Sequence, residues 1–203
     1  MIPRNRPAHY KLTKRIVDIV GAVFLLILTL PIVFFAMLLI KLTSPGPSFI
    51  RQIRLTEGGR CFGMYKLRTM RVDAEAKSGA TWASTADPRV TPIGRVLRRC
   101  RIDELPQLLN VLQGDMSLIG PRPERPEFAA SLTKVYPSFP RRMEMKAGLS
   151  GLAQVKAGYC GSTEEYRRKL AFDRLYVRHC SPALDLKIAF RTMFVLISGI
   201  GAR

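Results

Sequence analysis

The sequence predicts an α+β chain that is mainly helical, with a small β-hairpin and an N-terminal membrane segment. Three observations support this prediction: an uncharged apolar stretch at residues 19–40, two short β-patterned runs after it, and several later segments with helix start and stop signals. A chain of 203 residues suffices for one domain with a core and is short for two. We therefore expect a compact single domain, in which residues 1–45 anchor the chain and residues 46–203 form one structural unit.

The apolar stretch at residues 19–40 is long enough for a bilayer crossing, which takes about 20 residues. Pro31 lies near its middle and lacks the N–H that an α-helix needs, so the helix should kink or break there. Basic residues flank both ends, and basic flanks tend to stay in the cytoplasm. Both flanks therefore favour a re-entrant helix–break–helix segment, while a single kinked span with the N-terminus outside remains the alternative.

The hairpin and the first cytoplasmic helix have local signals. Residues 49–55 and 61–67 have strand character, and Gly58-Gly59 between them suits a hairpin turn. Thr91-Pro92 is typical of a helix N-cap followed by proline at the first helical position, and we expect this helix to run to about residue 101.

The remaining chain is predicted to be helix and loop. We expect a helix from near residue 103 and a loop at residues 114–126. A capping box at residues 162–165 should open a helix that ends before residue 181. Residues 183–200 have an apolar helical pattern, which suits either the core or a membrane interface.

The charge of the chain restricts its partners. Lys and Arg number 33 against 15 Asp and Glu, a net charge of +18, which favours nucleic acid, an anionic membrane surface or phosphorylated small molecules. The basic helix at residues 92–101 has no aromatic side chain, which disfavours the nucleic-acid alternative. The four cysteines lack C-x-x-C spacing and are typical of free thiols in a reducing cytosol.

An acidic pair, Asp103 and Glu104, directly follows the arginine-rich segment that contains Arg98. Both acids suit the start of a helix, where Asp caps and Glu interacts favourably with the helix dipole. The alternative is a site for an anionic substrate. A carboxylate among arginines has a lowered pKa and stays ionised, as a nucleophile must, and two neighbouring carboxylates attract a divalent cation.

Two further basic residues have both a plain and a functional interpretation. Arg122 stands between two prolines that restrict its backbone, so it is either a rigid phosphate ligand or part of a solvated connector. Lys66, at the end of the second strand, is either a substrate ligand or part of a solvated strand face.

Several segments together resemble one family. The segments are Lys14-Arg-Ile-Val-Asp18, Tyr65-Lys-Leu-Arg-Thr-Met70, Ile102-Asp-Glu-Leu-Pro-Gln-Leu108, Gly114-Asp-Met-Ser-Leu-Ile-Gly-Pro-Arg-Pro123, Gly148-Leu-Ser-Gly-Leu-Ala-Gln-Val155, the run around Asp173, and Leu184-Asp-Leu-Lys-Ile188. Their order resembles that of the monotopic phosphoglycosyl transferases, also called the bacterial sugar transferase family. The resemblance extends from about residue 11 to residue 191. One departure is Leu30, where many members carry serine before the helix-breaking proline; Thr29 is close enough to bond back to a helix carbonyl instead.

The resemblance implies a function and roles for particular residues. Family members transfer a sugar phosphate from a UDP-sugar to polyprenol phosphate, usually undecaprenyl phosphate, and release UMP. It implies Asp103 as nucleophile and Glu104 as a catalytic partner, with both carboxylates at a Mg²⁺ site. The substrate-binding residues that it implies are Lys66, Arg98, Arg122, Gln154, Lys14 and Arg15.

The resemblance also implies a place in the cell. It implies a catalytic domain on the cytoplasmic face of the bacterial inner membrane, with interfacial helices and a re-entrant anchor broken at Pro31. The product would be a polyprenyl-diphospho-sugar for O-antigen, capsule, exopolysaccharide or glycoprotein assembly. The remaining alternatives are a basic membrane scaffold without activity, which would not need the acidic pair, and a nucleic-acid-binding protein.

Overall fold

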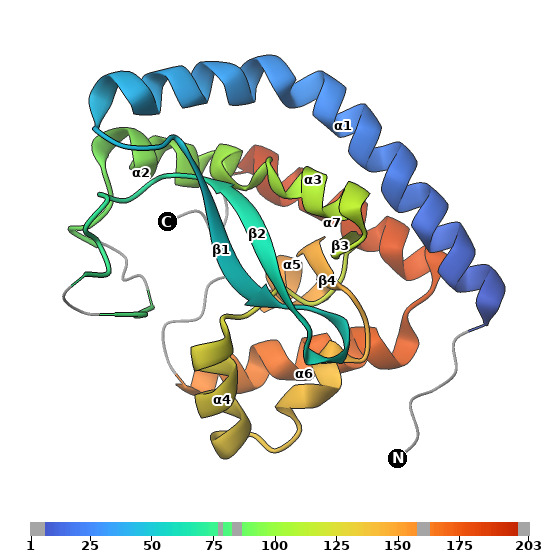
Figure 1. Cartoon of the computed structure of the whole chain (residues 1–203). Coiled ribbons are helices and arrows are strands. Elements are labelled where there is room, and N and C mark those ends of the chain that lie inside the picture. Colours follow the sequence, from blue (N-terminus) through green and yellow to red (C-terminus); the bar gives the residue numbers. More distant parts are fainter. Residues whose placement is uncertain (1–6, 77–78, 83–86, 158–162, 199–203) are drawn as a thin grey trace.

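The computed structural model describes residues 7–76, 79–82, 87–157 and 163–198, and helices surround two small sheets (Figure 1). The α-helices are α1 (Ala8–Thr43), α2 (Pro92–Arg99), α3 (Gln107–Gln113), α4 (Pro126–Val135), α5 (Leu152–Ala157), α6 (Thr163–His179) and α7 (Pro182–Ser198). The strands are β1 (Phe49–Leu55), β2 (Cys61–Leu67), β3 (Met116–Ile119) and β4 (Ala147–Ser150). Short 3-10 turns are η1 (Glu57–Gly59), η2 (Ile102–Glu104) and η3 (Phe139–Met143). The mainly helical α+β fold is confirmed.

The predicted hairpin is present with the predicted bounds. β1 and β2 pair antiparallel, with Phe49 opposite Leu67. Gly58 and Gly59 in the turn have φ of +69° and +74°, the left-handed region that glycine enters without steric cost. The side chain of Asn110 from α3 accepts a hydrogen bond from the Tyr65 N–H and donates one to the Gly63 carbonyl, both at 2.9 Å. These bonds fix α3 against β2 and so set the position of the turn that precedes α3.

α2 begins as predicted and is followed by a turn that the sequence analysis did not foresee. Thr91 Oγ1 accepts a hydrogen bond from the Gly94 N–H at 3.0 Å, which confirms the N-cap. The helix ends at Arg99, and Arg101 has φ of +55°, the one positive φ of a non-glycine residue within the described ranges. The chain then forms η2 before α3 starts at Gln107. The prediction of a helix from near residue 103 is therefore wrong by one turn.

The predicted loop at residues 114–126 contains a strand. β3 pairs in parallel with β4, with Met116 beside Ala147 and Ile119 beside Ser150. A Cβ on Gly148 would lie 2.1 Å from the Gly120 N, so the chains can approach this closely only because both positions are glycine. This strand was missed because its partner is far along the chain and four residues carry too short a pattern to read.

The C-terminal helices follow the prediction within the described residues, while the predicted bounds at residues 162 and 200 lie outside them. α6 ends at His179, before Ser181; the capping residue expected at Ser162 lies outside the described residues. α7 packs Ile188 into a core with Tyr176, as one of the two interpretations expected, and exposes other large apolar side chains; its place at a membrane interface stays a prediction. The exposed apolar residues of α7 are Leu186, Phe190, Met193, Phe194 and Leu196.

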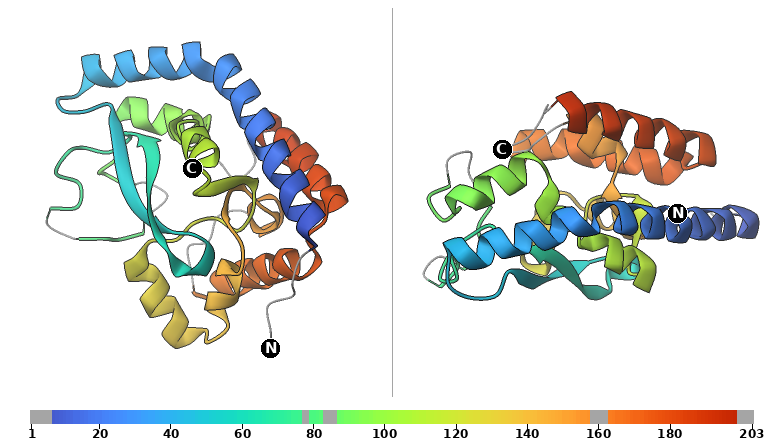
Figure 2. Two further views of the ribbon diagram at one scale, coloured as in Figure 1. Left: turned by 45° about the vertical axis from the view of Figure 1, so that its right-hand side comes forward. Right: turned by 90° about the horizontal axis from the view of Figure 1, so that it is seen from above.

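α1 is one continuous helix that runs through Pro31, so the break predicted there is absent, and its ribbon curves along one side of the molecule (Figures 1 and 2). Thr29 Oγ1 donates a hydrogen bond to the Leu25 carbonyl at 2.7 Å, the back-bond that the sequence suggested in place of serine. By length and composition α1 is able to cross a membrane. Most of its large apolar side chains are exposed, while Ala22, Ala36 and Ile40 are buried against the rest of the domain.

Candidate active site

Asp103 lies in η2 and is nearly inaccessible to solvent, with 3% of its side chain exposed. Its Oδ2 is 3.0 Å from Nζ of Lys66, which comes from β2 and is 17% exposed. Burial raises the pKa of Asp103 above its ordinary value, and the charge of Lys66 opposes this rise. The structure thus confines a carboxylate in a poorly hydrated place with one close cation.

Glu104, the next residue, has a different partner. Arg122 Nη1 donates to Glu104 Oε2 at 3.0 Å, and Arg122 Nη2 donates to Glu104 Oε1, so the two planar groups form a bidentate pair. Burial alone would raise the pKa of Glu104, but the charge and hydrogen bonds of Arg122 hold it well below its ordinary value. Glu104 is therefore ionised throughout the neutral pH range.

The sequence analysis anticipated a carboxylate with a lowered pKa among the arginines of α2. The pKa of Glu104 is lowered, as predicted. The prediction is wrong for Asp103, because burial outweighs the neighbouring positive charges and raises its pKa. The partners also differ, because Lys66 and Arg122 supply the ion pairs from β2 and from the β3–α4 loop. Arg98 instead donates from Nε to Thr69 Oγ1 at 2.8 Å, and its charge acts on Asp103 more weakly than that of Lys66.

Lys14 and Arg15 take part in the docking of α1. Arg15 donates to the carbonyls of Val111 at 2.6 Å and Leu112 at 2.8 Å, which belong to the C-terminal end of α3, where a cation is favourable. Lys14 Nζ lies 3.0 Å from Asp185 Oδ2 of α7. Arg15 thus occupies the opposite end of α3 from η2, and its role as a substrate ligand stays a prediction.

Asp18, in the same α1 segment, is also a docking residue. Its Oδ1 accepts hydrogen bonds from Ser117 Oγ at 3.0 Å and from the Leu118 N–H at 2.9 Å. These bonds join α1 to β3, directly before the loop that carries Arg122.

Two glutamines have amide atoms without hydrogen-bond partners in the described part of the chain. Gln154 donates from Nε2 to the Leu149 carbonyl at 2.9 Å, while its Oε1 is buried and unbonded. Gln107 is 1% exposed, and neither of its amide atoms is bonded. No role was predicted for Gln107, although it stands four residues after Asp103, about one helical turn along the chain.

Asp103 and Glu104 have the type of oxygen donor that a magnesium site with few protein ligands uses. Within the described residues no group of three or more His, Cys, Asp or Glu side chains is arranged to hold a metal. Magnesium commonly takes one or two carboxylates from the protein and completes its shell with water and substrate phosphates. Asp103 and Glu104 provide that donor set, and the cations now paired with them are also suited to phosphate oxygens.

Comparison with known proteins defines the family of this chain. The model of the bacterial sugar transferase family matches residues 9–199, and the chain belongs to this family. It is 43% identical over 194 residues to the UDP-N-acetylgalactosamine-undecaprenyl-phosphate N-acetylgalactosaminephosphotransferase of Aeromonas hydrophila, covering 96% of this chain and 46% of that protein. It is 44% identical over 190 residues to the UDP-glucose:undecaprenyl-phosphate glucose-1-phosphate transferase of Caulobacter vibrioides, covering 92% and 70%.

A relative of similar length is the exopolysaccharide production protein PSS of Rhizobium leguminosarum. It is 39% identical over 186 residues, which cover 89% of this chain and 92% of that protein. The chain therefore spans about half of the Aeromonas relative and nearly all of the Rhizobium relative.

Proposed function

We propose that the protein transfers a sugar phosphate from a UDP-sugar to a polyprenol phosphate such as undecaprenyl phosphate, with release of UMP. The observation that carries the proposal is the buried carboxylate of Asp103, held 3.0 Å from Lys66 and beside the Glu104–Arg122 pair. A carboxylate that water scarcely reaches is suited to attack phosphorus, because competing hydrolysis is suppressed. Membership of the family and the printed names of its relatives support the same reaction.

In the first step an oxygen of Asp103 attacks the phosphorus that bears the sugar. The bond from that phosphorus to the oxygen of the second phosphate breaks, and UMP leaves with the electron pair. The enzyme then carries the sugar phosphate on Asp103 as a mixed anhydride. Two anions must approach each other in this step, so Lys66 and Arg122 serve to offset the charge of the diphosphate.

In the second step a phosphate oxygen of the polyprenol phosphate attacks the same phosphorus. The bond to Asp103 breaks and its carboxylate is regenerated, which gives polyprenyl-diphospho-sugar. The division into two steps lets each anionic substrate enter a site that the other has left. Lys66 then pairs again with the free carboxylate.

Asp103 and Glu104 would hold a Mg²⁺ ion together with the substrate diphosphate, where the ion would neutralise negative charge. For this, Arg122 has to exchange Glu104 for a phosphate oxygen, which its planar fork can bind equally well. Glu104 is suited to the ligand role because its lowered pKa keeps it ionised.

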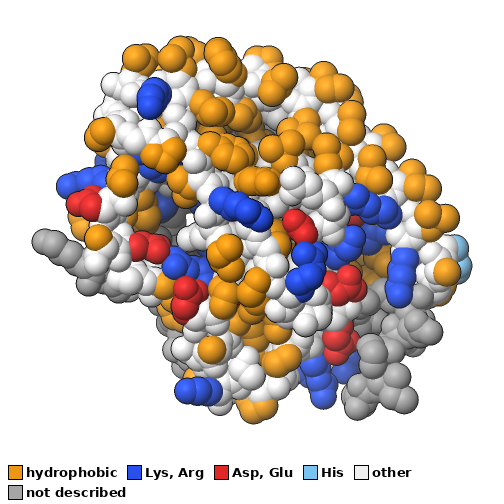
Figure 3. Space-filling model, viewed as in Figure 1, with side chains coloured by type: hydrophobic (Ala, Val, Ile, Leu, Met, Phe, Trp, Pro, Cys, Tyr) orange, Lys and Arg blue, Asp and Glu red, His pale blue; other side chains and the backbone are white. Residues whose placement is uncertain are grey.

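The surface supports a membrane location. Apolar side chains gather along α1 in the space-filling view (Figure 3). Phe190 and Phe194 of α7 are exposed as well. Asp18 near one end of α1 bonds to β3, and Ile40 near the other end packs with Leu67. A straight span would place its ends on opposite sides of the bilayer, whereas both ends here contact one domain. This favours a re-entrant anchor on the cytoplasmic face of the bacterial inner membrane.

The relatives are named for different donor sugars. Two relatives of nearly equal identity, 43% and 44%, are named for N-acetylgalactosamine and for glucose. Similarity of this degree favours neither sugar, and both belong in the first assay.

The test is UMP release by protein purified in detergent or nanodiscs, with magnesium, undecaprenyl phosphate and a panel of UDP-sugars. We expect release with at least one sugar and no turnover by Asp103→Ala, with a phosphosugar adduct on Asp103 detectable by mass spectrometry when the acceptor is omitted. Full activity of Asp103→Ala would exclude it as the nucleophile. Absence of release across the panel, with folded protein, would contradict the proposed reaction.

A further inference from the structure

The loop between β3 and α4 carries Arg122, and its backbone is held through its carbonyl oxygens. Four consecutive carbonyls each accept a hydrogen bond from a different donor group. The donors are the Gly148 N–H to Pro121 at 2.9 Å, Arg142 Nη2 to Arg122 at 2.8 Å, Arg54 Nη1 to Pro123 at 3.2 Å and the Leu55 N–H to Glu124 at 2.9 Å. We call this arrangement the carbonyl clamp.

The clamp suits the composition of the loop. Pro121 and Pro123 have no N–H, so an ordinary strand ladder cannot hold this segment, and fixation has to come largely through carbonyls. While its carbonyl accepts the hydrogen bond from Arg142, the side chain of Arg122 extends to Glu104. The direction of Arg122 therefore depends on the donors of the clamp.

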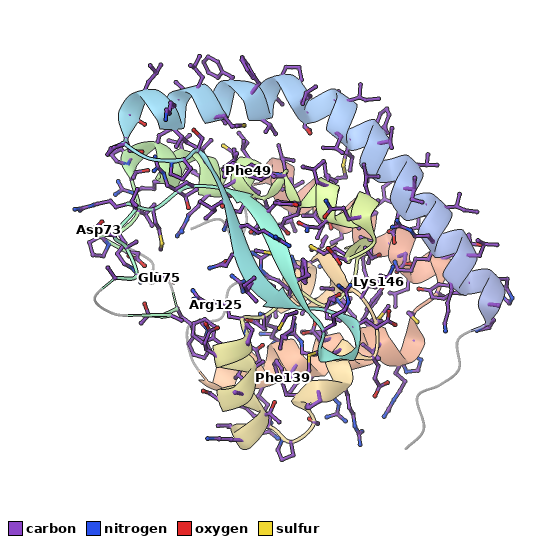
Figure 4. The ribbon with its side chains drawn as sticks, viewed as in Figure 1. Phe49, Asp73, Glu75, Arg125, Phe139 and Lys146 are labelled. Carbon is purple, nitrogen blue, oxygen red and sulfur yellow. The ribbon has the colours of Figure 1, made fainter. Side chains whose placement is uncertain are left out.

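Arg142 is the donor that bonds Arg122 itself, and it is fixed in turn. Its Nε and Nη2 lie 2.9 Å and 2.7 Å from Oδ2 of Asp173 in α6, and both side chains are almost fully buried. Its guanidinium lies 5.2 Å from the ring centre of Phe139, the first residue of η3, which is labelled in Figure 4. One planar group thus connects α6 to the carbonyl of Arg122.

A second buried acid reinforces the same loop. Glu124 Oε1 accepts hydrogen bonds from Tyr166 Oη at 3.0 Å and Lys169 Nζ at 2.9 Å, and Arg142 Nη1 lies 3.8 Å from the same oxygen. Burial would raise the pKa of Glu124, but Lys169 and Arg142 hold it at about 2.

Buried charges of this kind are poor explanations of stability. Well-packed apolar residues often replace a buried ion pair with no loss, since desolvation offsets the attraction. What apolar residues cannot supply is a directed donor to a backbone carbonyl. The ion pair of Arg142 and Asp173 is therefore better explained by the geometry that it imposes on the loop.

We propose that Arg142, oriented by Asp173, is a positioning residue that fixes the approach of Arg122 to the substrate diphosphate. The inference rests on the proposed function, in which Arg122 binds phosphate oxygens. Arg142 has no direct contact with substrate in this scheme and acts only through the carbonyl of Arg122.

The experiment is a double-mutant cycle on UDP binding, measured by calorimetry with magnesium on the full chain in nanodiscs. Arg142→Lys keeps the charge but replaces the planar fork that joins Asp173 to the Arg122 carbonyl with a single ammonium group. We expect the Kd for UDP to rise roughly tenfold, as for the loss of one hydrogen bond from a charged donor. In an Arg122→Gln background the same substitution should change Kd less than twofold, because the group that it positions is gone.

Arg89→Lys is the matched control, since Arg89 forms a fork with the buried carboxylate of Asp87 and leaves the loop untouched. Arg89→Lys should leave the Kd for UDP unchanged, even if it lowers the thermal midpoint of unfolding. If Arg142→Lys does not fold, Arg142→Met combined with Asp173→Asn removes the clamp donor without leaving the carboxylate of residue 173 as an unpaired buried charge, and the same cycle applies.

If Arg142→Lys and Arg122→Gln act independently, so that the double variant has the product of their two effects on Kd, the positioning role is overturned. It is also overturned if Arg142→Lys lowers the thermal midpoint but leaves Kd unchanged. A wild-type chain that fails to bind UDP would instead contradict the proposed function. The two failures are therefore distinguishable in one series.

Discussion

Replacement of Lys66 by Met separates two roles that Lys66 can play. Methionine keeps much of the side-chain volume and removes the charge that lies 3.0 Å from Asp103 Oδ2. Opposite unit charges at this distance attract by roughly 5 kcal/mol at an effective dielectric constant of ~20. Arg98 and water at the partly exposed Lys66 site recover part of this, so we take a net loss of about 2–3 kcal/mol from the ionised state.

This loss predicts how activity depends on pH. Burial already raises the pKa of Asp103, and Lys66→Met removes the largest opposing influence, so the pKa rises further. The attacking carboxylate is lost as pH falls through that pKa, and in the variant this loss begins at a higher pH. At neutral pH we expect kcat/KM to fall by up to roughly 100-fold, since about 1.4 kcal/mol corresponds to a factor of ten and the full loss appears only below the pKa of Asp103. UMP release measured from pH 6 to 10 should show recovery at the alkaline end.

Arg60→Met is the control, because Arg60 is an exposed cation, 58% accessible, that pairs with Asp115. It should leave the pH profile unchanged. Stability offers a second readout. Because the folded-state pKa of Asp103 lies above its unfolded value, Lys66→Met should unfold more easily as pH rises through the folded pKa. An equal loss of activity at every pH would refute this reasoning and make Lys66 a ligand of the substrate alone.

Three further predictions concern the metal, the membrane and the docking of α1. Glu104→Gln should raise the magnesium concentration needed for half-maximal UMP release; an unchanged requirement would remove Glu104 from the metal site. Cysteines introduced by His9→Cys and Lys41→Cys, in a background without native cysteines, should react only with reagent on the cytoplasmic side, and periplasmic labelling of position 9 would indicate a span. Asp18→Ala should destabilise the fold by about 2–3 kcal/mol, seen as a lower thermal midpoint, because it removes the acceptor of the buried Ser117 hydroxyl and of the Leu118 N–H; no change would mean that water replaces the carboxylate.

The parts of the fold that sequence predicted have local causes. Gly58 and Gly59 fix the hairpin turn, and Thr91 before a proline fixes the start of α2. The parallel pair of β3 and β4 was missed because it forms between segments about 30 residues apart and depends on the close approach of Gly120 and Gly148. Such pairing is decided by the whole fold, which a local pattern does not encode.

For the site, the sequence indicated which residues matter but not which residues they contact. The motif drew attention to Asp103, Glu104 and Arg122 in advance, but their partners depend on tertiary structure. Lys66 reaches Asp103 from a strand 37 residues earlier, and Arg122 reaches Glu104 from a loop 18 residues later. The clamp donor Arg142 had no sequence signal at all, since a buried arginine and an exposed one look alike in a basic chain.

The pKa values of the adjacent carboxylates Asp103 and Glu104 are shifted in opposite directions, which suits them to different roles. Burial raises the pKa of Asp103, while Arg122 lowers that of Glu104, although one peptide bond joins the two residues. Neighbouring acids with pKa values pushed apart are typical of sites in which each has its own role. Glu104 is ionised at any neutral pH and suits a permanent cation ligand. The pKa of Asp103 is raised by burial and lowered by the charge of Lys66, so its reactivity depends on the same cations that would offset the charge of the proposed diphosphate substrate.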